Sequence, residues 1–146
     1  MSGVSVRPIL LVEDNPHDEL LTLRALRRVN LANRIDVARD GQQALDYLLA
    51  HGEFSHRKDA QLPLVVLLDI GLPRLSGLEV LEKLRAEPRT ALLPVVIFTS
   101  SDEDTDRLKS YAHRCNSFVR KPVDFNSFAE TVARMGMYWL ATNACP

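Results

Sequence analysis

The chain has 146 residues and a formal net charge of −1, and 46% of its residues are hydrophobic. This length and composition suit one domain with its own core and exclude a disordered chain. The balance of charges gives no sign that nucleic acid or a membrane surface is the main partner. No apolar run approaches the roughly 20 residues of a membrane-spanning helix, and acids interrupt the start too early for a signal peptide. We expect one cytoplasmic domain over residues 1–146, with Cys115 and Cys145 as reduced thiols.

Short apolar runs alternate with longer amphipathic segments along the whole chain. In chain order, we expect a strand at 8–13, a helix at 16–30, a strand at 35–38, a helix at 41–51, a strand at 64–68, a helix at 77–86, a strand at 94–98, a helix at 102–113, a strand at 117–119 and a helix at 124–141. The apolar runs are continuous, which is typical of strands buried on both faces of a parallel sheet. The pattern predicts an α/β fold, a five-stranded parallel sheet flanked by five helices. Residues 51–63 are polar and are expected to form a loop.

Polar side chains follow four of the predicted strands, at the edge of the sheet where open α/β folds bind ligands. Glu13 and Asp14 end the first strand, Asp69 the third and Thr99 the fourth, and Lys121 directly follows the fifth. Three carboxylates, a hydroxyl and an ammonium are therefore expected to converge at one place.

Each of these residues also has a purely structural interpretation. Asp14 or Asn15 can cap the helix that begins at Pro16, and Ser100 can open a capping box. Asp69 alone could be a loop residue, and a lysine alone a solvated charge. The joint placement at corresponding ends of four strands favours a shared functional site.

The chemistry of such a cluster points to a cation and a phosphoryl group. Two like charges about 4 Å apart repel by roughly 4 kcal/mol at an effective dielectric constant of 20, so clustered acids need a cation. Oxygen ligands without His or Cys favour Mg²⁺. A lysine beside a metal and a carboxylate suits a phosphoryl group on that carboxylate, and Thr99 can donate a hydrogen bond to it. We therefore predict that Asp69 is a nucleophile presented for phosphorylation.

The combination of Glu13-Asp14, Asp69 with Pro73 and Gly77, Thr99-Ser100 and Lys121-Pro122 resembles the receiver domain of two-component response regulators. The likeness runs over a core of about residues 7–135, followed by a C-terminal helix extension of about residues 136–146. It implies a flavodoxin-like receiver fold that takes a phosphoryl group from a histidine kinase, as in bacterial signalling. Such a protein catalyses only its own phosphoryl transfer and dephosphorylation.

The resemblance also implies a role for each site residue. Asp14 and Asp69 would bind Mg²⁺ directly, Glu13 would bind it through water, and Gly71 would offer its backbone carbonyl. Lys121 and Thr99 would assist the transfer to Asp69, and Thr99 with Phe118 would form the switch pair. Many receivers carry a side chain at the position of Gly71 that modulates the attacking water, so its absence concerns the dephosphorylation rate.

Two features are similar to the single-domain regulators that serve phytochrome-type histidine kinases. They are the long polar segment 51–63 and the extended end MYWLATNACP. The downstream partner is left open, and one alternative is an intermediate shuttle that passes the phosphoryl group to a phosphotransfer protein.

Other classes of protein fit the sequence less well. An aspartyl phosphatase of the haloacid dehalogenase type needs a second acid two residues after its nucleophile, where this chain has Gly71. The nucleotide-binding motif GxxxxGK[ST] is absent. A flavodoxin-like cofactor binder would share the fold but not the acids. A transcription factor would need a DNA-binding domain, and none is expected before Pro146.

The end of the last predicted helix is apolar where a monomer would place charges. Met137, Tyr138, Trp139 and Leu140 follow one another there. Exposed patches of this kind mark interfaces, so we predict a homodimer through these residues. The alternative is that the tail folds back over its own domain.

Overall fold

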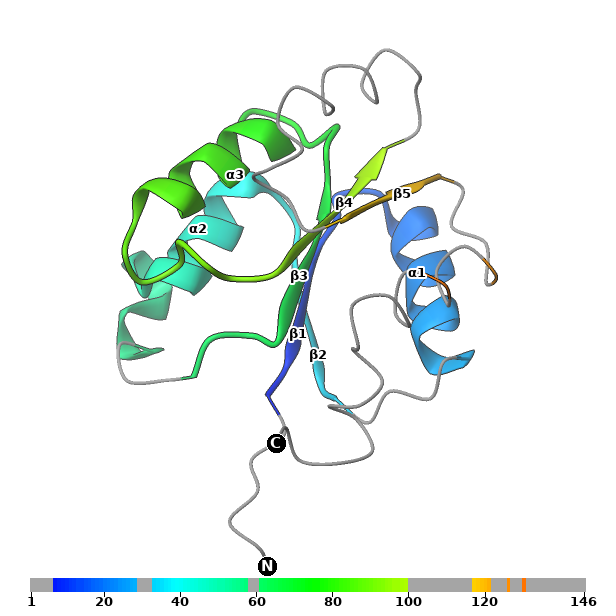
Figure 1. The fold of residues 1–146 in the computed structure, drawn as a ribbon, viewed down its shortest axis with the longest axis horizontal. Helices are drawn as coiled ribbons and strands as arrows, with labels where there is room; N and C mark the ends of the chain where they lie inside the picture. Colours follow the sequence, from blue (N-terminus) through cyan, green and yellow to red (C-terminus); the bar gives the residue numbers. More distant parts are fainter. Residues whose placement is uncertain are drawn as a thin grey trace, which may run out of the picture.

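Five parallel strands form a single sheet in the middle of the molecule (Figure 1). The structure is a computed structural model, and it describes residues 7–28, 33–57, 61–99 and 117–121, together with residues 126 and 130. The strands are β1 (Ile9–Val12), β2 (Ile35–Ala38), β3 (Val65–Asp69), β4 (Val95–Thr99) and β5 (Ser117–Arg120). The predicted five-stranded parallel sheet is confirmed, and no strand end differs from its expected position by more than one residue.

The strand order is β2-β1-β3-β4-β5, so the chain begins in the middle of the sheet and builds outward in both directions. The order reverses between β1 and β3, and the crevice at such a reversal is where open α/β sheets bind ligands. The register there pairs Val12 with Leu68, so Glu13 and Asp69 follow at the same level. On the other side Thr99 pairs with Arg120, which places Lys121 one step beyond the end of β4.

Three described α-helices cover the sheet, α1 (Pro16–Arg28) on one face and α2 (Gly41–Leu49) with α3 (Gly77–Ala86) on the other (Figure 1). Each central strand sends alternate side chains into two separate cores. Leu10, Val66 and Ile97 belong to the core with α2 and α3, whereas Leu11, Leu67 and Phe98 belong to the core with α1. Both faces of the central strands are therefore buried, which explains the continuous apolar runs in the sequence.

The segment before β3 differs from the prediction of a loop. Residues 52–57 form a 3₁₀-helix, η1 (Gly52–Arg57), that packs against α2. The ring of Phe54 meets the ring of Tyr47 edge-on at 5.5 Å between centroids, and the guanidinium of Arg57 lies 3.7 Å from the centroid of Tyr47. The polar composition of the segment gave no sign of these contacts, because only Phe54 and Arg57 make them.

Several predictions from the sequence lie outside the described residues. They are the helix at 102–113, all but residues 126 and 130 of the helix at 124–141, the two cysteines, and the interface residues Met137, Tyr138, Trp139 and Leu140. Residues 126 and 130 are both helical. In the part of the chain that is described, no helix has both the length and the apolar character needed to cross a membrane.

Candidate functional site

Three carboxylates meet where β1 and β3 end. One oxygen from each of Glu13, Asp14 and Asp69 lies within 4.8 Å of the other two. Glu13 is completely buried, Asp69 is 7% exposed, and Asp14 faces solvent. Of the three acids, Asp14 is therefore the one that connects the cluster to solvent. The sequence predicted this convergence correctly, because parallel strands in register deliver their carboxyl ends to one edge.

The loop after β3 turns sharply behind Asp69 and holds its carboxylate in the cluster. The N–H of Gly71 donates to Oδ1 of Asp69 at 3.2 Å, and the N–H of Gly77 donates to the carbonyl of Ile70 at 3.1 Å. A Cβ at position 77 would lie 2.5 Å from the carbonyl oxygen of Asp69, so this close approach requires glycine. By contrast, a Cβ at Gly71 would meet only Oδ1 of Asp69, at 3.9 Å.

Lys121 brings its ammonium group into the acid cluster from the edge strand β5. Its backbone N–H donates to the carbonyl of Thr99 at 2.7 Å, which fixes the start of the side chain. Its Nζ lies 2.8 Å from Oε1 of Glu13, 2.9 Å from Oδ2 of Asp18 and 3.3 Å from Oδ2 of Asp69. The lysine side chain is only 9% exposed, so one nearly buried cation serves three carboxylates.

The pKa values of Glu13 and Lys121 reflect burial and the charges around them. Burial, with a smaller contribution from the charge of Asp69, raises the pKa of Glu13 to about 7, although the hydrogen bond from Lys121 opposes the shift. Burial alone would lower the pKa of Lys121, but its hydrogen bonds to Glu13 and Asp18 outweigh burial and hold it above the usual range. The lysine is therefore always charged, yet it does not neutralise the acids around it.

These residues fit a divalent cation. The three clustered ligand atoms are all carboxylate oxygens, the donor type that Mg²⁺ prefers. Burial raises the pKa of Glu13, so its ionised form is only partly stabilised by the protein groups around it. A cation at this edge would supply the missing positive charge.

The hydrogen bonds in the first turn of α1 identify the residue that caps this helix. Oδ1 of Asn15 accepts hydrogen bonds from the backbone N–H groups of His17 and Asp18, at 2.9 and 3.1 Å. Asn15 is therefore the helix cap, one of the two candidates that the sequence offered. The N–H of Asn15 in turn donates to Oε2 of Glu13 at 3.2 Å and helps to orient that carboxylate.

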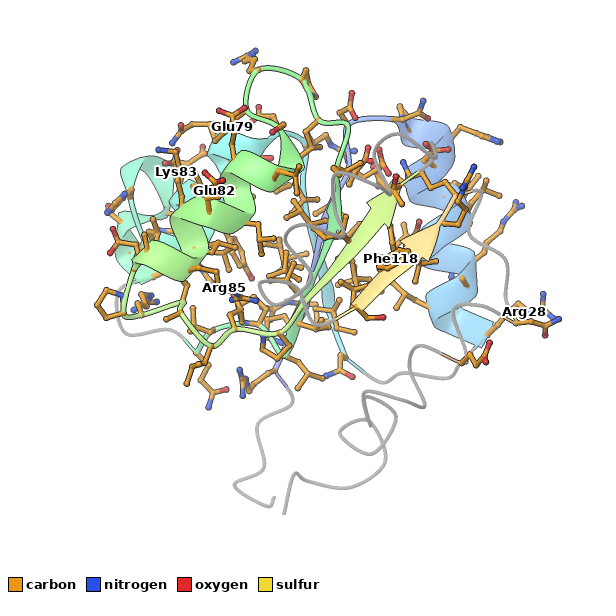
Figure 2. The ribbon with its side chains drawn as sticks, turned by 45° about the horizontal axis from the view of Figure 1, so that its top comes forward. Arg28, Glu79, Glu82, Lys83, Arg85 and Phe118 are labelled. Carbon is orange, nitrogen blue, oxygen red and sulfur yellow. The ribbon has the colours of Figure 1, made fainter. Side chains whose placement is uncertain are left out.

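The two residues expected to form a switch occupy different environments. Thr99 is fully buried at the end of β4, whereas Phe118 on edge strand β5 has 42% of its surface exposed (Figure 2). Ser100 and Pro122, which completed the sequence motif, lie outside the described residues.

Sequence reasoning missed Asp18 as a member of the site. A signal was available, because Asp18 lies in the first turn of the predicted helix, close in sequence to Glu13 and Asp14. Acids are, however, common in first helical turns for their favourable interaction with the helix dipole, which made this one unremarkable.

The strand order and this acid–lysine cluster define an α/β domain with a charged site at the carboxyl ends of its strands, and comparison with known proteins identifies the family. The chain matches the family described as "Response regulator receiver domain" over residues 9–133, and it belongs to that family.

Two solved bacteriophytochrome response regulators are similar to this chain, each with 46% sequence identity over 97% of it. AtBRR is covered over 98% of its length with a TM-score of 0.82, and RtBRR over 85% with a TM-score of 0.86. A further relative is the "Probable methanogenesis regulatory protein FilR2" of Methanothrix harundinacea (strain 6Ac). It is 41% identical over 138 residues, which cover 94% of this chain and 86% of that protein. The chain is thus a receiver-domain response regulator homologous to phytochrome response regulators.

Proposed function

We propose that this chain is a stand-alone response regulator that accepts a phosphoryl group from a histidine kinase onto Asp69. The observation that carries the proposal is the setting of Asp69, at 3.3 Å from a nearly buried lysine and within 4.8 Å of two further acids. A salt bridge made only for stability would not need the additional carboxylates, because they repel one another. The surplus charge is useful when a cation and a phosphoryl group enter together.

The transfer forms one bond and breaks another. A carboxylate oxygen of Asp69 attacks phosphorus, the P–N bond of a phosphohistidine donor breaks, and its electron pair stays on the imidazole. Lys121 donates to a phosphoryl oxygen and offsets the charge gathered there. Thr99, at the end of β4, supplies a hydroxyl to another phosphoryl oxygen. Glu13, Asp14, Asp69 and the carbonyl of Gly71 would hold Mg²⁺, which when bound neutralises charge on the phosphoryl oxygens.

The phosphorylated form would signal through Thr99 and Phe118. With the threonine hydroxyl engaged by the phosphoryl group, the ring of Phe118 would leave its half-exposed position and turn inward. This is a population shift between two states of the edge formed by β5, and partners would read the altered surface. Thr99→Ala should still accept phosphate but lose any change in partner binding.

A phytochrome-type kinase is the proposed donor, because AtBRR and RtBRR bear that association in their names. The name of FilR2 carries a different association, with methanogenesis. The donor can be identified by comparing the rates at which the histidine kinases of one cell transfer phosphate to this chain. Onward transfer to a phosphotransfer protein remains the alternative output. The homodimer through Met137, Tyr138, Trp139 and Leu140, and the cytoplasmic location, also stay proposals.

Acetyl phosphate tests the central claim directly. The protein is incubated with acetyl phosphate and Mg²⁺, and phosphorylation is read as a shifted band on a phosphate-affinity gel. The shift should vanish in Asp69→Asn and after chelation of the metal. Asp46→Asn, which removes a carboxylate from α2 away from the site, should shift like the wild type. A shifted band that survives Asp69→Asn would refute the assignment.

A further inference from the structure

Asp18 is the partner of Lys121 that stands apart from the three clustered acids. Its Oδ2 lies 2.9 Å from Nζ, closer than the 3.3 Å that separates Nζ from Asp69. The two residues are 103 positions apart in the sequence, so the contact joins the first turn of α1 to the end of β5. The acid group that could hold a cation includes Glu13 and Asp69 but not Asp18.

The position of Asp18 in its helix does not account for this contact. Its backbone N–H is already capped by Asn15, and the helix dipole would be served equally well by a carboxylate without this partner. The next residue, Glu19, lies on the same turn and pairs with Arg39, a cation whose side chain is 58% exposed. Asp18 instead directs its charge to an ammonium group that is only 9% exposed.

A cation at the site changes what Glu13 and Asp69 can offer to the lysine. Both carboxylates would turn part of their charge toward the cation, which also repels the ammonium group directly. Phosphorylation then replaces the carboxylate oxygens of Asp69 with an acyl phosphate. Of the three contacts that Lys121 makes here, only the one with Asp18 is untouched by these events.

We propose that Asp18 is a positioning residue that keeps the Lys121 ammonium beside Asp69 while the divalent cation and the phosphoryl group occupy the site. This inference rests on the function proposed above. Asp18 touches neither the phosphorus nor the donor; it holds one N–H of the lysine, so that another can reach a phosphoryl oxygen. The chain thus carries its own anchor for the lysine in the first turn of α1.

Phosphorylation rates give the first test. With acetyl phosphate and saturating Mg²⁺, Asp18→Asn should accept phosphate about tenfold more slowly than the wild type, the effect of losing one charge-assisted hydrogen bond. Asp18→Glu should recover most of the rate. Glu19→Gln is the matched control, with the same change of charge on the same turn, and its rate should stay within about twofold of the wild type.

A double-mutant cycle shows whether Asp18 acts through the lysine. In the Lys121→Met background, the substitution Asp18→Asn should have no further effect on the rate, because the group it positions is gone. A second readout needs no turnover: the ¹⁵N signal of the Lys121 ammonium in the Mg²⁺-loaded protein. It should be visible in the wild type and in Glu19→Gln, and lost in Asp18→Asn. Asp18→Ser has the same expected results, so the test does not depend on the folding of one variant.

The failures of the two proposals look different. Wild-type protein that gains no phosphate on Asp69 overturns the proposed function and this inference with it. Wild-type protein that is phosphorylated normally, while Asp18→Asn reacts equally fast or adds its full effect to Lys121→Met, overturns the inference alone. An unchanged ammonium signal in Mg²⁺-loaded Asp18→Asn does the same.

Discussion

Two charged clusters of this molecule differ in how fully their carboxylates are paired. The site cluster consists of Glu13, Asp14, Asp18, Asp69 and Lys121, and the β2 cluster consists of Arg34, Asp36, Tyr47 and Arg57. In the β2 cluster, Asp36 accepts hydrogen bonds from Arg34 at 3.0 Å and from the hydroxyl of Tyr47 at 2.5 Å. Burial would raise the pKa of Asp36, but these partners outweigh it and lower the pKa, and Arg57 contributes in the same direction. In the site cluster, burial raises the pKa of Glu13 to about 7 although Lys121 is only 2.8 Å away.

The difference teaches how to separate a structural charge network from a functional one. Asp36 has enough donors to stay ionised below its usual pKa. The β2 cluster is therefore complete, in the sense that protein groups alone compensate the charge of its carboxylate. Glu13 shares a single lysine with Asp18 and Asp69, so the site cluster is incomplete until a cation arrives. Removal of one acid should therefore change stability in opposite directions at the two places.

The largest effect on stability is expected from removing the ammonium group of Lys121, which three carboxylates share. Lys121→Met should lower the free energy of unfolding of the metal-free protein by about 3 kcal/mol, because it leaves a buried carboxylate without its partner. Added Mg²⁺ should restore part of the loss. Urea unfolding with and without Mg²⁺ measures both effects.

The control for this change is Lys83→Met on the exposed side of α3 (Figure 2). It removes the same charge from a solvated position and should change stability by less than about 0.5 kcal/mol. If Lys83→Met and Lys121→Met are equally stable, the site cluster does not depend on its lysine.

Removing one acid from each cluster should give opposite signs. Asp36→Asn loses charge-assisted hydrogen bonds and should destabilise the protein by about 2 kcal/mol. Asp14→Asn relieves repulsion at an exposed position and should stabilise the metal-free protein by about 0.5 kcal/mol, as at other functional sites that hold surplus charge. Thermal unfolding in the presence of a chelator measures both, and a loss of stability in Asp14→Asn would contradict the proposed imbalance.

The pKa of Glu13 predicts how the protein responds to pH. Its pKa in the folded state, about 7, exceeds the ordinary value of 4.5, so the folded state holds this proton more tightly. The resulting stability is fully present below pH 4.5 and is lost as pH rises through about 7 in the metal-free protein. Cation binding displaces the proton, so Mg²⁺ affinity should fall roughly tenfold per pH unit below that value.

Titration calorimetry at several pH values tests this expectation. The pH dependence of Mg²⁺ affinity should be much weaker in Glu13→Gln, which has no proton to release. Linkage predicts a roughly tenfold change of the Mg²⁺ affinity per pH unit in this range. A wild-type affinity that stays constant between about pH 5.5 and 7 would therefore show that Glu13 is already ionised.

The sequence was sufficient for the frame of the molecule and for most of the site. Strands β1, β3 and β4 were predicted from apolar runs that contribute to two cores, and the acids at the ends of β1 and β3 converge because these parallel strands end at the same edge. Asp18 could not be found in the same way, since its contact depends on how the first turn of α1 meets the end of β5. The β2 cluster escaped for a related reason: its members come from β2, α2 and a segment that reads as a polar loop.

The smallest effect is expected in the β2 cluster, from removing the hydroxyl group of Tyr47. Tyr47 is 6% exposed, and burial together with the hydrogen bond to Asp36 raises its pKa to about 12. A raised pKa means that the stability from this group is complete below pH 10, the ordinary pKa of tyrosine, and is lost as pH rises through about 12. Tyr47→Phe keeps the ring contacts with Phe54 and Arg57 but loses the hydrogen bond, so it should cost about 1 kcal/mol at neutral pH. Above pH 10 the wild type should lose stability faster than the variant, and urea unfolding at pH 7 and pH 11 measures both. Phosphorylation of Asp69 should be unchanged, because the hydroxyl belongs to the cluster that is already complete; a phosphorylation defect in Tyr47→Phe would show that the two clusters are coupled.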